Sequence, residues 1–301
     1  MDVISRIAGI ILPVFLIIAA GYVYARLRGE QVAEDMAGIS RVNVELLSPV
    51  LLFSALASRD FDLVANLPLI FAGILISLGS GLLAWPVARL LGYDPRTFVP
   101  PMIYNNCGNM GVPLIVLAFG ASALSEAVAM YVAGTLVYFT VGIWIIESGR
   151  KGPRLSMRRT LANPIIMSVL LGILFAALRI PLPTMLLQAM RMLGEAAIPV
   201  MLIALGVRMV DVSFAHWRIG LVGAVVCPLS GLIVAWGVDQ LLVLSATQRG
   251  QMYLFAVLPP AVFSFMIAGA YKQEPDKVAA IVMLGNLAAL VFVPLGLWFG
   301  L

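Results

Sequence analysis

The stretch 104–114, which reads Y-N-N-C-G-N-M-G-V-P-L, brings polar residues into an otherwise apolar segment. It contains three side-chain amides, two glycines and one proline, and the candidate binding residues among them are Asn105, Asn106, Asn109, Gly108 and Pro113. The amides can donate hydrogen bonds to carboxylate oxygens or accept them from hydroxyl groups. The glycine and the proline should break a helix here, and the peptide groups freed by the break need protein or water around them in a membrane. We therefore take this stretch as the first candidate for a binding site.

A second break is expected at 258–261, where Leu-Pro-Pro-Ala includes Pro259 and Pro260 and is followed by Ser264. A half-helix that starts after a break carries free N–H groups and a partial positive charge, which together favour a carboxylate. Neither break contains Asp, Glu, Lys or Arg. The site is thus expected to be uncharged apart from the helix ends, which argues against a simple cation as ligand. Alternatively, these residues only cap and pack the broken helices.

The composition places both breaks inside a membrane protein. Of 301 residues, 62% are hydrophobic and 11% are charged, and the mean hydropathy is +1.04. A net charge of +4 on such a chain reflects its orientation and contact with anionic lipid rather than nucleic acid. Cys107, Cys227 and the single His216 have no metal-site spacing, and we expect neither a metal nor a cofactor.

Ten apolar segments are long enough to cross a bilayer, each with roughly 20 residues. They lie near 7–25, 37–57, 67–90, 98–121, 126–146, 162–178, 187–207, 218–240, 251–271 and 278–299. Most Lys and Arg residues fall on one side of this arrangement, which is predicted to be cytoplasmic. The chain is then a multi-pass protein of the cell (inner) membrane, with both termini on the non-cytoplasmic side and a cytoplasmic loop at 147–161.

The pattern R-x3-E-x3-P-V-x-L begins at Arg41 in the second segment and again at Arg191 in the seventh. Five segments separate the two copies, and an odd number means that the second half is inserted upside down. The sequence therefore predicts an inverted repeat, with five helices in 1–146 and five in 162–301. Coincidence among apolar helices that contain proline is the alternative.

Glu45 and Glu195 belong to this repeated pattern and are the most deeply placed carboxylates. An ionisable group within a membrane is a functional hypothesis by default, and here it would be proton coupling. Each glutamate also follows an arginine by four residues, so both could be paired anchors near the ends of their helices. The structural interpretation is favoured, and the coupling role stays open.

Three stretches together resemble the auxin efflux carrier family, which includes the plant PIN auxin exporters and bacterial proteins described as malate or malonate permeases. They are 104–114, the sequence P-P-A-V-F-S-F-M-I-A-G-A-Y at 259–271, and the E-x3-P-V-x-L of the second segment. The resemblance implies an all-α fold of two inverted five-helix repeats, related to sodium/bile acid symporters and sodium/proton antiporters. It also implies broken fourth and ninth helices that cross at Pro113 and at Pro259 or Pro260. A dimeric scaffold of helices 1, 2, 6 and 7 would carry a domain that moves like an elevator.

The resulting hypothesis is a secondary transporter of small organic anions, either auxin-like monocarboxylates or dicarboxylates such as malate and malonate. A proton- or sodium-coupled carboxylate symporter and a membrane receptor that binds without transporting are the alternatives. An enzyme is not expected, because no nucleophile, base and orienting residue occur together. The expected partners are the anion, membrane lipid and a second copy of the chain bound through the second and seventh segments.

Overall fold

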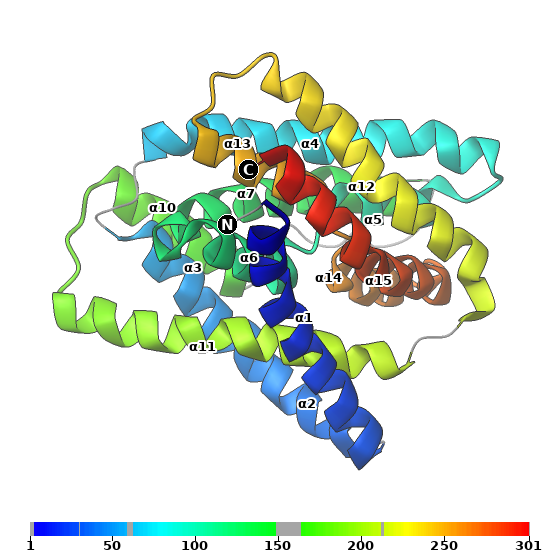
Figure 1. Cartoon of the computed structure of the whole chain (residues 1–301), viewed down its shortest axis with the longest axis horizontal. Helices are drawn as coiled ribbons and strands as arrows, with labels where there is room; N and C mark the ends of the chain where they lie inside the picture. Colours follow the sequence, from blue (N-terminus) through cyan, green and yellow to red (C-terminus); the bar gives the residue numbers. More distant parts are fainter. Residues whose placement is uncertain (1–2, 30, 59–62, 149–163, 212–213, 301) are drawn as a thin grey trace.

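The computed structural model of the chain describes residues 3–29, 31–58, 63–148, 164–211 and 214–300. Helices account for almost all of these residues, and the β-structure among them is one isolated bridge. The predicted all-α class is thus confirmed (Figure 1). Most of the loop predicted at 147–161 lies outside the described residues.

Seven helical stretches of the described chain are long and apolar enough to cross a membrane. Five of them are single helices, namely α1 (Val3–Arg28), α4 (Leu63–Leu90), α11 (Thr184–Arg208), α12 (Trp217–Asp239) and α15 (Pro275–Gly300). The sixth runs from α2 (Gln31–Val42) through the π-turn η1 (Asn43–Leu47) into α3 (Ser48–Leu56). The seventh joins η3 (Ala121–Ala123), α7 (Leu124–Val137), the π-turn η4 (Tyr138–Gly142) and α8 (Ile143–Glu147).

Three further apolar stretches are shorter or interrupted. The helix α10 (Pro164–Ala177) is short, and the helix at 98–121 is divided into α5 (Pro95–Ile103) and the pair η2 (Cys107–Gly111) and α6 (Val112–Phe119). The helix at 251–271 is divided into α13 (Ala246–Ala256) and α14 (Val262–Ala270). Both interruptions that the sequence predicts are therefore present. The 3₁₀ turns η5 (Met209–Asp211) and η6 (Phe214–His216) lie between α11 and α12.

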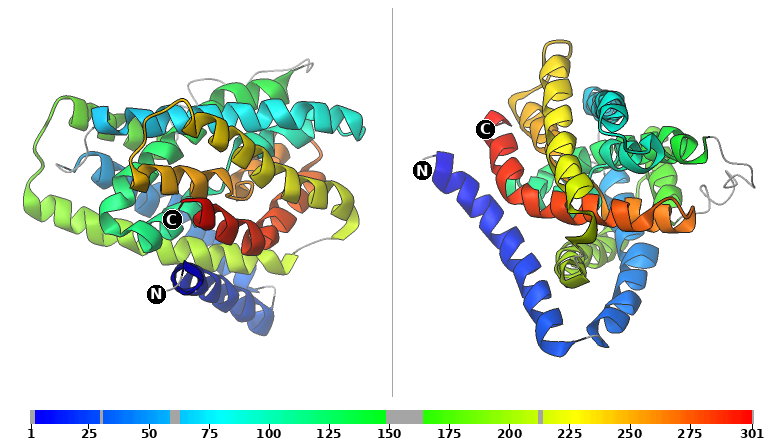
Figure 2. Two further views of the ribbon diagram at one scale, coloured as in Figure 1. Left: turned by 45° about the horizontal axis from the view of Figure 1, so that its top comes forward. Right: turned by 90° about the vertical axis from the view of Figure 1, so that its right-hand side faces the viewer.

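The helices pack as two groups, which meet face to face (Figure 2). In the first group α11 packs against α1 and α3, and α3 packs against α10. In the second group α4 packs against α5, α7 and α12, while α15 packs against α12, α13 and α14. Both interrupted helices belong to the second group, so the breaks lie within one packed unit.

In each group one glycine permits the closest approach between two helices. A Cβ at Gly206 of α11 would lie 1.9 Å from the Ile18 carbonyl oxygen of α1. A Cβ at Gly231 of α12 would lie 2.0 Å from the carbonyl oxygen of Ala256, the residue where α13 ends. Small residues allow helix backbones to approach in this way inside membranes. The second break is thus held against α12 by direct backbone contact.

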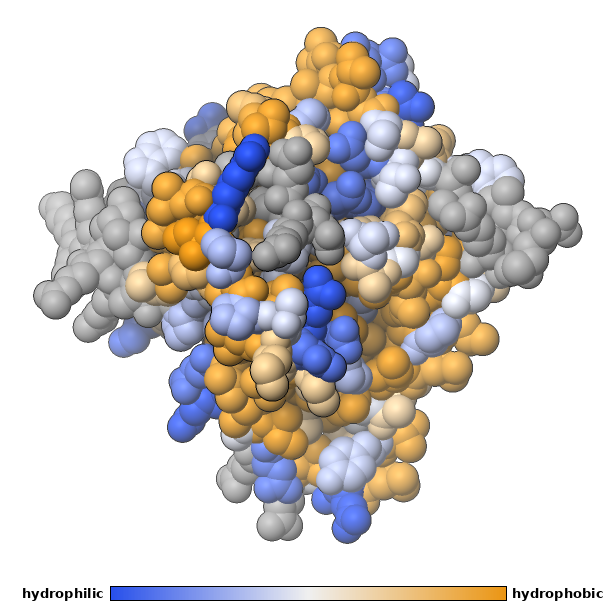
Figure 3. All heavy atoms as spheres, turned by 90° about the vertical axis from the view of Figure 1, so that its left-hand side faces the viewer, coloured by the Kyte–Doolittle hydropathy of each residue, from blue (hydrophilic) through white to orange (hydrophobic). Residues whose placement is uncertain are grey.

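Apolar side chains cover much of the face of the molecule shown in Figure 3. Large side chains such as Leu82 on α4 and Val291 on α15 are 75% and 67% exposed. Soluble monomers rarely carry contiguous apolar surface on this scale. The surface fits a chain surrounded by lipid, as the composition predicts.

Candidate functional site

The two interrupted helices touch each other at their breaks. Asn105 and Pro260 form an isolated antiparallel bridge. Beside it, the backbone N–H of Asn106 donates to the carbonyl oxygen of Pro259 at 2.7 Å. Peptide groups released from each helix are therefore bonded to the other break, which satisfies them without water.

The position of this contact corrects one expectation from the family resemblance. Pro113 was expected at the crossing, but it lies further along, in the first turn of α6. The π-turn η2 leads directly into α6, so Pro113 lies inside the half-helix that begins at Cys107 and not at the break. The crossing is formed by Asn105 and not by Pro113, whereas Pro259 and Pro260 are at the contact as expected.

Both downstream half-helices begin at this contact. The first starts at Cys107 and the second at Val262. Their early N–H groups, on Gly108, Asn109, Val262 and Phe263, have no backbone acceptor in the part of the chain that the structure describes. All four residues line one cavity. Two partially positive helix ends are thus directed at the same space.

Two of the predicted asparagines hold the crossing together through their side chains. Asn105 Nδ2 donates to the carbonyl oxygen of Phe255 at 2.7 Å, and Asn106 Nδ2 donates to Asn286 Oδ1 at 2.8 Å. The amide of Asn286, on α15, in turn donates to the Pro260 carbonyl at 3.3 Å. Sequence reasoning missed Asn286, although a lone asparagine in an apolar helix was a signal for it. These amides position the breaks as well as lining or flanking the cavity.

Asn109 differs from its two neighbours. It is half-buried and lines the cavity, and its side chain forms no hydrogen bond with any described residue. An amide in this position can donate to a ligand without giving up a bond within the protein. Of the three predicted asparagines, Asn109 is the one whose side chain is available.

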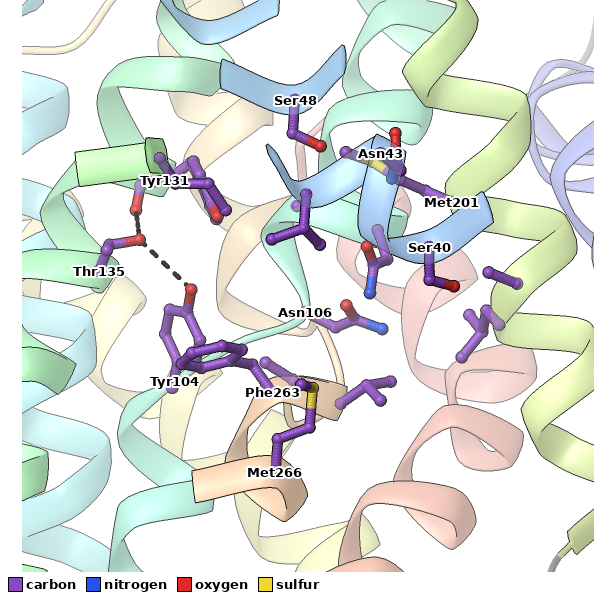
Figure 4. A pocket seen from close by; sticks show the side chains of 18 of the residues that line it. Ser40, Asn43, Ser48, Tyr104, Asn106, Tyr131, Thr135, Met201, Phe263 and Met266 are labelled. Atoms are coloured by element: carbon purple, nitrogen blue, oxygen red, sulfur yellow. Dashed lines mark hydrogen bonds between the residues drawn. The ribbon is translucent and has the colours of Figure 1, made fainter. Parts of the chain in front are cut away.

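The cavity lies between the two helix groups and encloses about 930 Å³, including its open mouth. We call it the central cavity. One wall is mainly aromatic and comes from the second group, with Tyr104, Tyr131, Phe139 and Phe263. In Figure 4 Ser40, Asn43 and Met201 of the first group lie on the opposite side of the cavity. The remaining lining residues include Gly108, Asn105, Asn106 and Asn109.

The aromatic wall is fixed by its own contacts. The rings of Tyr104 and Tyr138 stack with centroids 4.5 Å apart. The Tyr104 hydroxyl lies 3.4 Å from Thr135 Oγ1, which donates to the Tyr131 carbonyl at 2.8 Å (Figure 4). Offset aromatic pairs of this kind add rigidity to a binding surface. The wall therefore presents flat apolar faces rather than free polar groups.

Four of the predicted binding residues do not line the central cavity. They are Pro113, Pro259, Pro260 and Ser264. Ser264 is 2% exposed and lies on a buried face of α14. The prolines act through the backbone, as described above. Gly108 lines the cavity, and a Cβ added there would lie 3.2 Å from the Tyr131 ring.

The two predicted coupling glutamates occupy different environments. Glu45 is exposed on η1 and lines none of the cavities described here. Glu195 lines a second space, the distal cavity, together with Arg191, Ser54, Ser58 and other residues of α3, α7 and α11. No ion pair joins either glutamate to the arginine four residues before it, although all four residues are described. The paired-anchor interpretation therefore lacks its expected contact.

Arg208 is a charged lining residue that sequence reasoning missed. It ends α11, is half-buried, and forms no ion pair or hydrogen bond with a described residue. Among the described residues it is the only charged one that lines the central cavity, so this cavity is not uncharged in the way the sequence predicts for the site. The prediction counted it only as an orientation signal at a helix end. Asn43, also missed, is 5% exposed, and its Oδ1 lacks a hydrogen-bond partner.

A polar cluster outside the apolar helices joins the ends of the two interrupted segments. Thr97, at the start of α5, donates to Glu274 Oε2 at 2.6 Å, and Gln273 donates to Asp94 Oδ2 at 3.1 Å. The hydrogen bond from Arg96 lowers the pKa of Asp94. Burial raises the pKa of Glu274, but hydrogen bonds from Lys277 and Thr97 outweigh it and lower this pKa overall. The cluster therefore keeps both carboxylates ionised near neutral pH.

An all-helical membrane protein whose two broken helices meet at a ligand-sized cavity belongs structurally with the membrane transporters. Comparison with known sequences names the family. The chain belongs to the family described as membrane transport protein, the auxin efflux carrier family, whose model matches residues 7–155 and 153–297. The chain is accordingly a multi-pass membrane transporter and not an enzyme.

Relatives along the full length carry similar descriptions. An uncharacterized transporter of Methanothermobacter thermautotrophicus is 26% identical over 298 residues, covering 95% of each chain. A putative malonate transporter of Rhizobium meliloti is 25% identical over 312 residues, covering 96% of this chain and 94% of its own. An uncharacterized transporter of Methanocaldococcus jannaschii is 19% identical over 307 residues, covering 96% of this chain and 97% of its own.

Proposed function

We propose that this chain is a secondary transporter of small organic anions and that the carboxylate binds where the two broken helices meet. The supporting observation is the convergence of two half-helix N-termini on one cavity. Four residues line it whose backbone N–H groups have no backbone acceptor among the described residues, namely Gly108, Asn109, Val262 and Phe263, and Arg208 lines it as well. No Asp or Glu is among the described residues that line it. Such a set of donors favours a carboxylate and disfavours a cation.

The proposed architecture is ten membrane-spanning segments in two inverted halves. The seven long helical stretches, the short α10 and the two interrupted helices together supply that number. Related polar contacts occur in both halves. Thr97 in the first turn of α5 donates to Glu274, and Gln251 in the middle of α13 donates to Glu126. In each case the acceptor precedes or begins the helix that follows the other interrupted segment, as an inverted repeat requires.

Transport in this proposal uses alternating access, with the second helix group moving against the first like an elevator. The central cavity is lined by Ser40, Asn43 and Ser48 along α2 to α3 and by Met201 and Arg208 of α11. The distal cavity is lined by residues further along α3 and nearer the start of α11. Spaces at opposite ends of the same two helices are what two access states need. The Arg208 end is predicted to be cytoplasmic, and a homodimer would form through α2 to α3 and α11.

The direct test is uptake of labelled malonate, malate and indole-3-acetate by the purified chain in proteoliposomes. We expect concentration-dependent uptake of at least one of these anions, which a receptor that only binds would not give. Asn109→Ala should lower the rate roughly tenfold, because a hydrogen bond to a charged ligand contributes about 1.5–3 kcal/mol. Asn66→Ala on α4, outside the central cavity, is the matched control. Saturable binding without uptake, or uptake unaffected by Asn109→Ala, would overturn the proposal or its site.

A further inference from the structure

Arg208 has no partner within the described protein, although it is half-buried and ends an apolar helix. A charge withdrawn from water is costly unless another group compensates it. The neighbouring residues of the central cavity are apolar or neutral. The central cavity thus has no carboxylate among its described lining residues to compensate this guanidinium, and an anionic ligand there would supply one.

The place of Arg208 within the cavity is as informative as its charge. It lines the central cavity and also the adjoining inner cavity, which contains His216 and Asp276. Val262 and Met266 line both spaces as well. Arg208 thus stands at the junction between the space at the crossing and the space next to it. A ligand at the crossing has the half-helix N-termini on one side and Arg208 toward this junction.

The remaining walls of the central cavity offer no positively charged group that could bind a second carboxylate. The aromatic wall has its Tyr104 hydroxyl engaged with Thr135, and its rings present apolar faces. Ser40, Ser48 and Asn43 on the opposite wall are neutral. A monocarboxylate needs one anion site, which the helix ends supply. A dicarboxylate needs two anion sites, and Arg208 is the cationic side chain that can supply the second.

We propose that Arg208 is the residue that selects dicarboxylates, by binding the second carboxylate while the first lies at the crossing. The guanidinium can form two parallel hydrogen bonds to one carboxylate, which gives directional recognition as well as charge. This inference rests on the proposed function. It adds that the preferred substrates are short dianions such as malonate and that Arg208 discriminates them from monoanions.

The test compares malonate with indole-3-acetate, a monocarboxylate whose ring suits the aromatic wall. Uptake of both labelled anions is measured in proteoliposomes for the wild-type chain, Arg208→Gln and Arg208→Lys. We expect Arg208→Gln to raise the apparent KM for malonate roughly tenfold or more, with little change for indole-3-acetate. Arg208→Lys keeps the charge but not the paired donors, so it should recover part of the difference.

Arg218→Gln is the matched control, since Arg218 is exposed, stacks over Trp217 and lies outside the central cavity. It removes one positive charge from the same end of the protein and should leave the ratio of the two KM values unchanged. Retained uptake of indole-3-acetate shows that Arg208→Gln is folded. Equal losses for both anions, loss of all uptake in Arg208→Gln, or a wild type that prefers the monoanion would each overturn the role of Arg208. A wild type that moves no carboxylate would instead remove the proposed function itself.

Discussion

The break at 104–106 and the break at 257–261 meet in one bridge, but they are built from different residues. The first contributes the side-chain amides of Asn105, Asn106 and the nearby Asn109. The second contributes two prolines, whose carbonyl groups accept hydrogen bonds from Asn106 and Asn286. The side-chain amides of the crossing are thus concentrated in the first break. The second break supplies rigid backbone and two N–H groups.

A second difference separates residues within the first break. The side-chain amides of Asn105 and Asn106 donate hydrogen bonds to other residues of the protein, whereas the amide of Asn109 is available for a ligand. The comparison therefore distinguishes residues that hold the crossing from residues that contact the ligand. Three predictions, ordered from the largest expected effect to the smallest, test this distinction and two further contrasts between regions of the molecule.

The first prediction concerns the stability of the crossing. Asn105→Ala removes the 2.7 Å hydrogen bond to the Phe255 carbonyl, which then keeps only the backbone N–H groups at the end of α13, such as that of Leu258 at 3.3 Å. The loss of one such hydrogen bond costs about 0.5–1.5 kcal/mol. We expect a clear fall in the melting temperature of the purified chain in detergent.

Asn109→Ala serves as the control for this measurement, because it removes an amide that has no hydrogen-bond partner among the described residues. Its melting temperature should stay close to that of the wild type while transport falls. If both variants lose stability equally, the proposed division between Asn105 and Asn109 is wrong.

The sequence alone predicts both breaks but only part of the site. Asn, Gly and Pro in an apolar segment were enough to locate both breaks, because their effect on a helix is local. The residue at which the breaks touch was not predictable, since the Asn105–Pro260 bridge joins positions far apart in the chain. Arg208 was missed because a cation at a helix end looks the same in sequence whether it faces lipid headgroups or a cavity. Ser264 was assigned to the site because the orientation of a short half-helix cannot be read from its sequence.

The second prediction compares the two copies of the repeated glutamate. Both side chains are exposed, but Glu195 lines the distal cavity, whereas Glu45 lies away from the cavities. For proton coupling, a carboxylate must bind and release protons through the water of a transport cavity, so it must face such a cavity. If transport is proton-coupled, Glu195→Gln should reduce uptake driven by a pH gradient several-fold, and Glu45→Gln should leave it unchanged.

Uptake driven separately by a proton gradient and by a sodium gradient measures this effect. Dependence on sodium alone would exclude both glutamates as proton carriers and favour a sodium-coupled symporter. Indifference to both gradients would indicate facilitated movement. Equal responses of Glu45→Gln and Glu195→Gln to a pH gradient would show that exposure to the distal cavity is not the deciding feature.

The smallest expected effect concerns the polar cluster that ties the start of the first interrupted helix to the turn after the second. Asp94 and Glu274 have pKa values below their ordinary values of 3.8 and 4.5, so their ionised forms stabilise the fold. This contribution is complete above those ordinary values and is lost as the pH falls through the lowered pKa values. The wild-type melting temperature should therefore fall between about pH 5 and pH 3, and Asp94→Asn should make that fall smaller by on the order of 1–2 °C.

Asp35→Asn, an exposed change on α2 outside the cluster, should retain the wild-type pH dependence. If Asp94→Asn behaves like Asp35→Asn, the two broken helices are held together by their crossing alone, and the cluster adds nothing to their union.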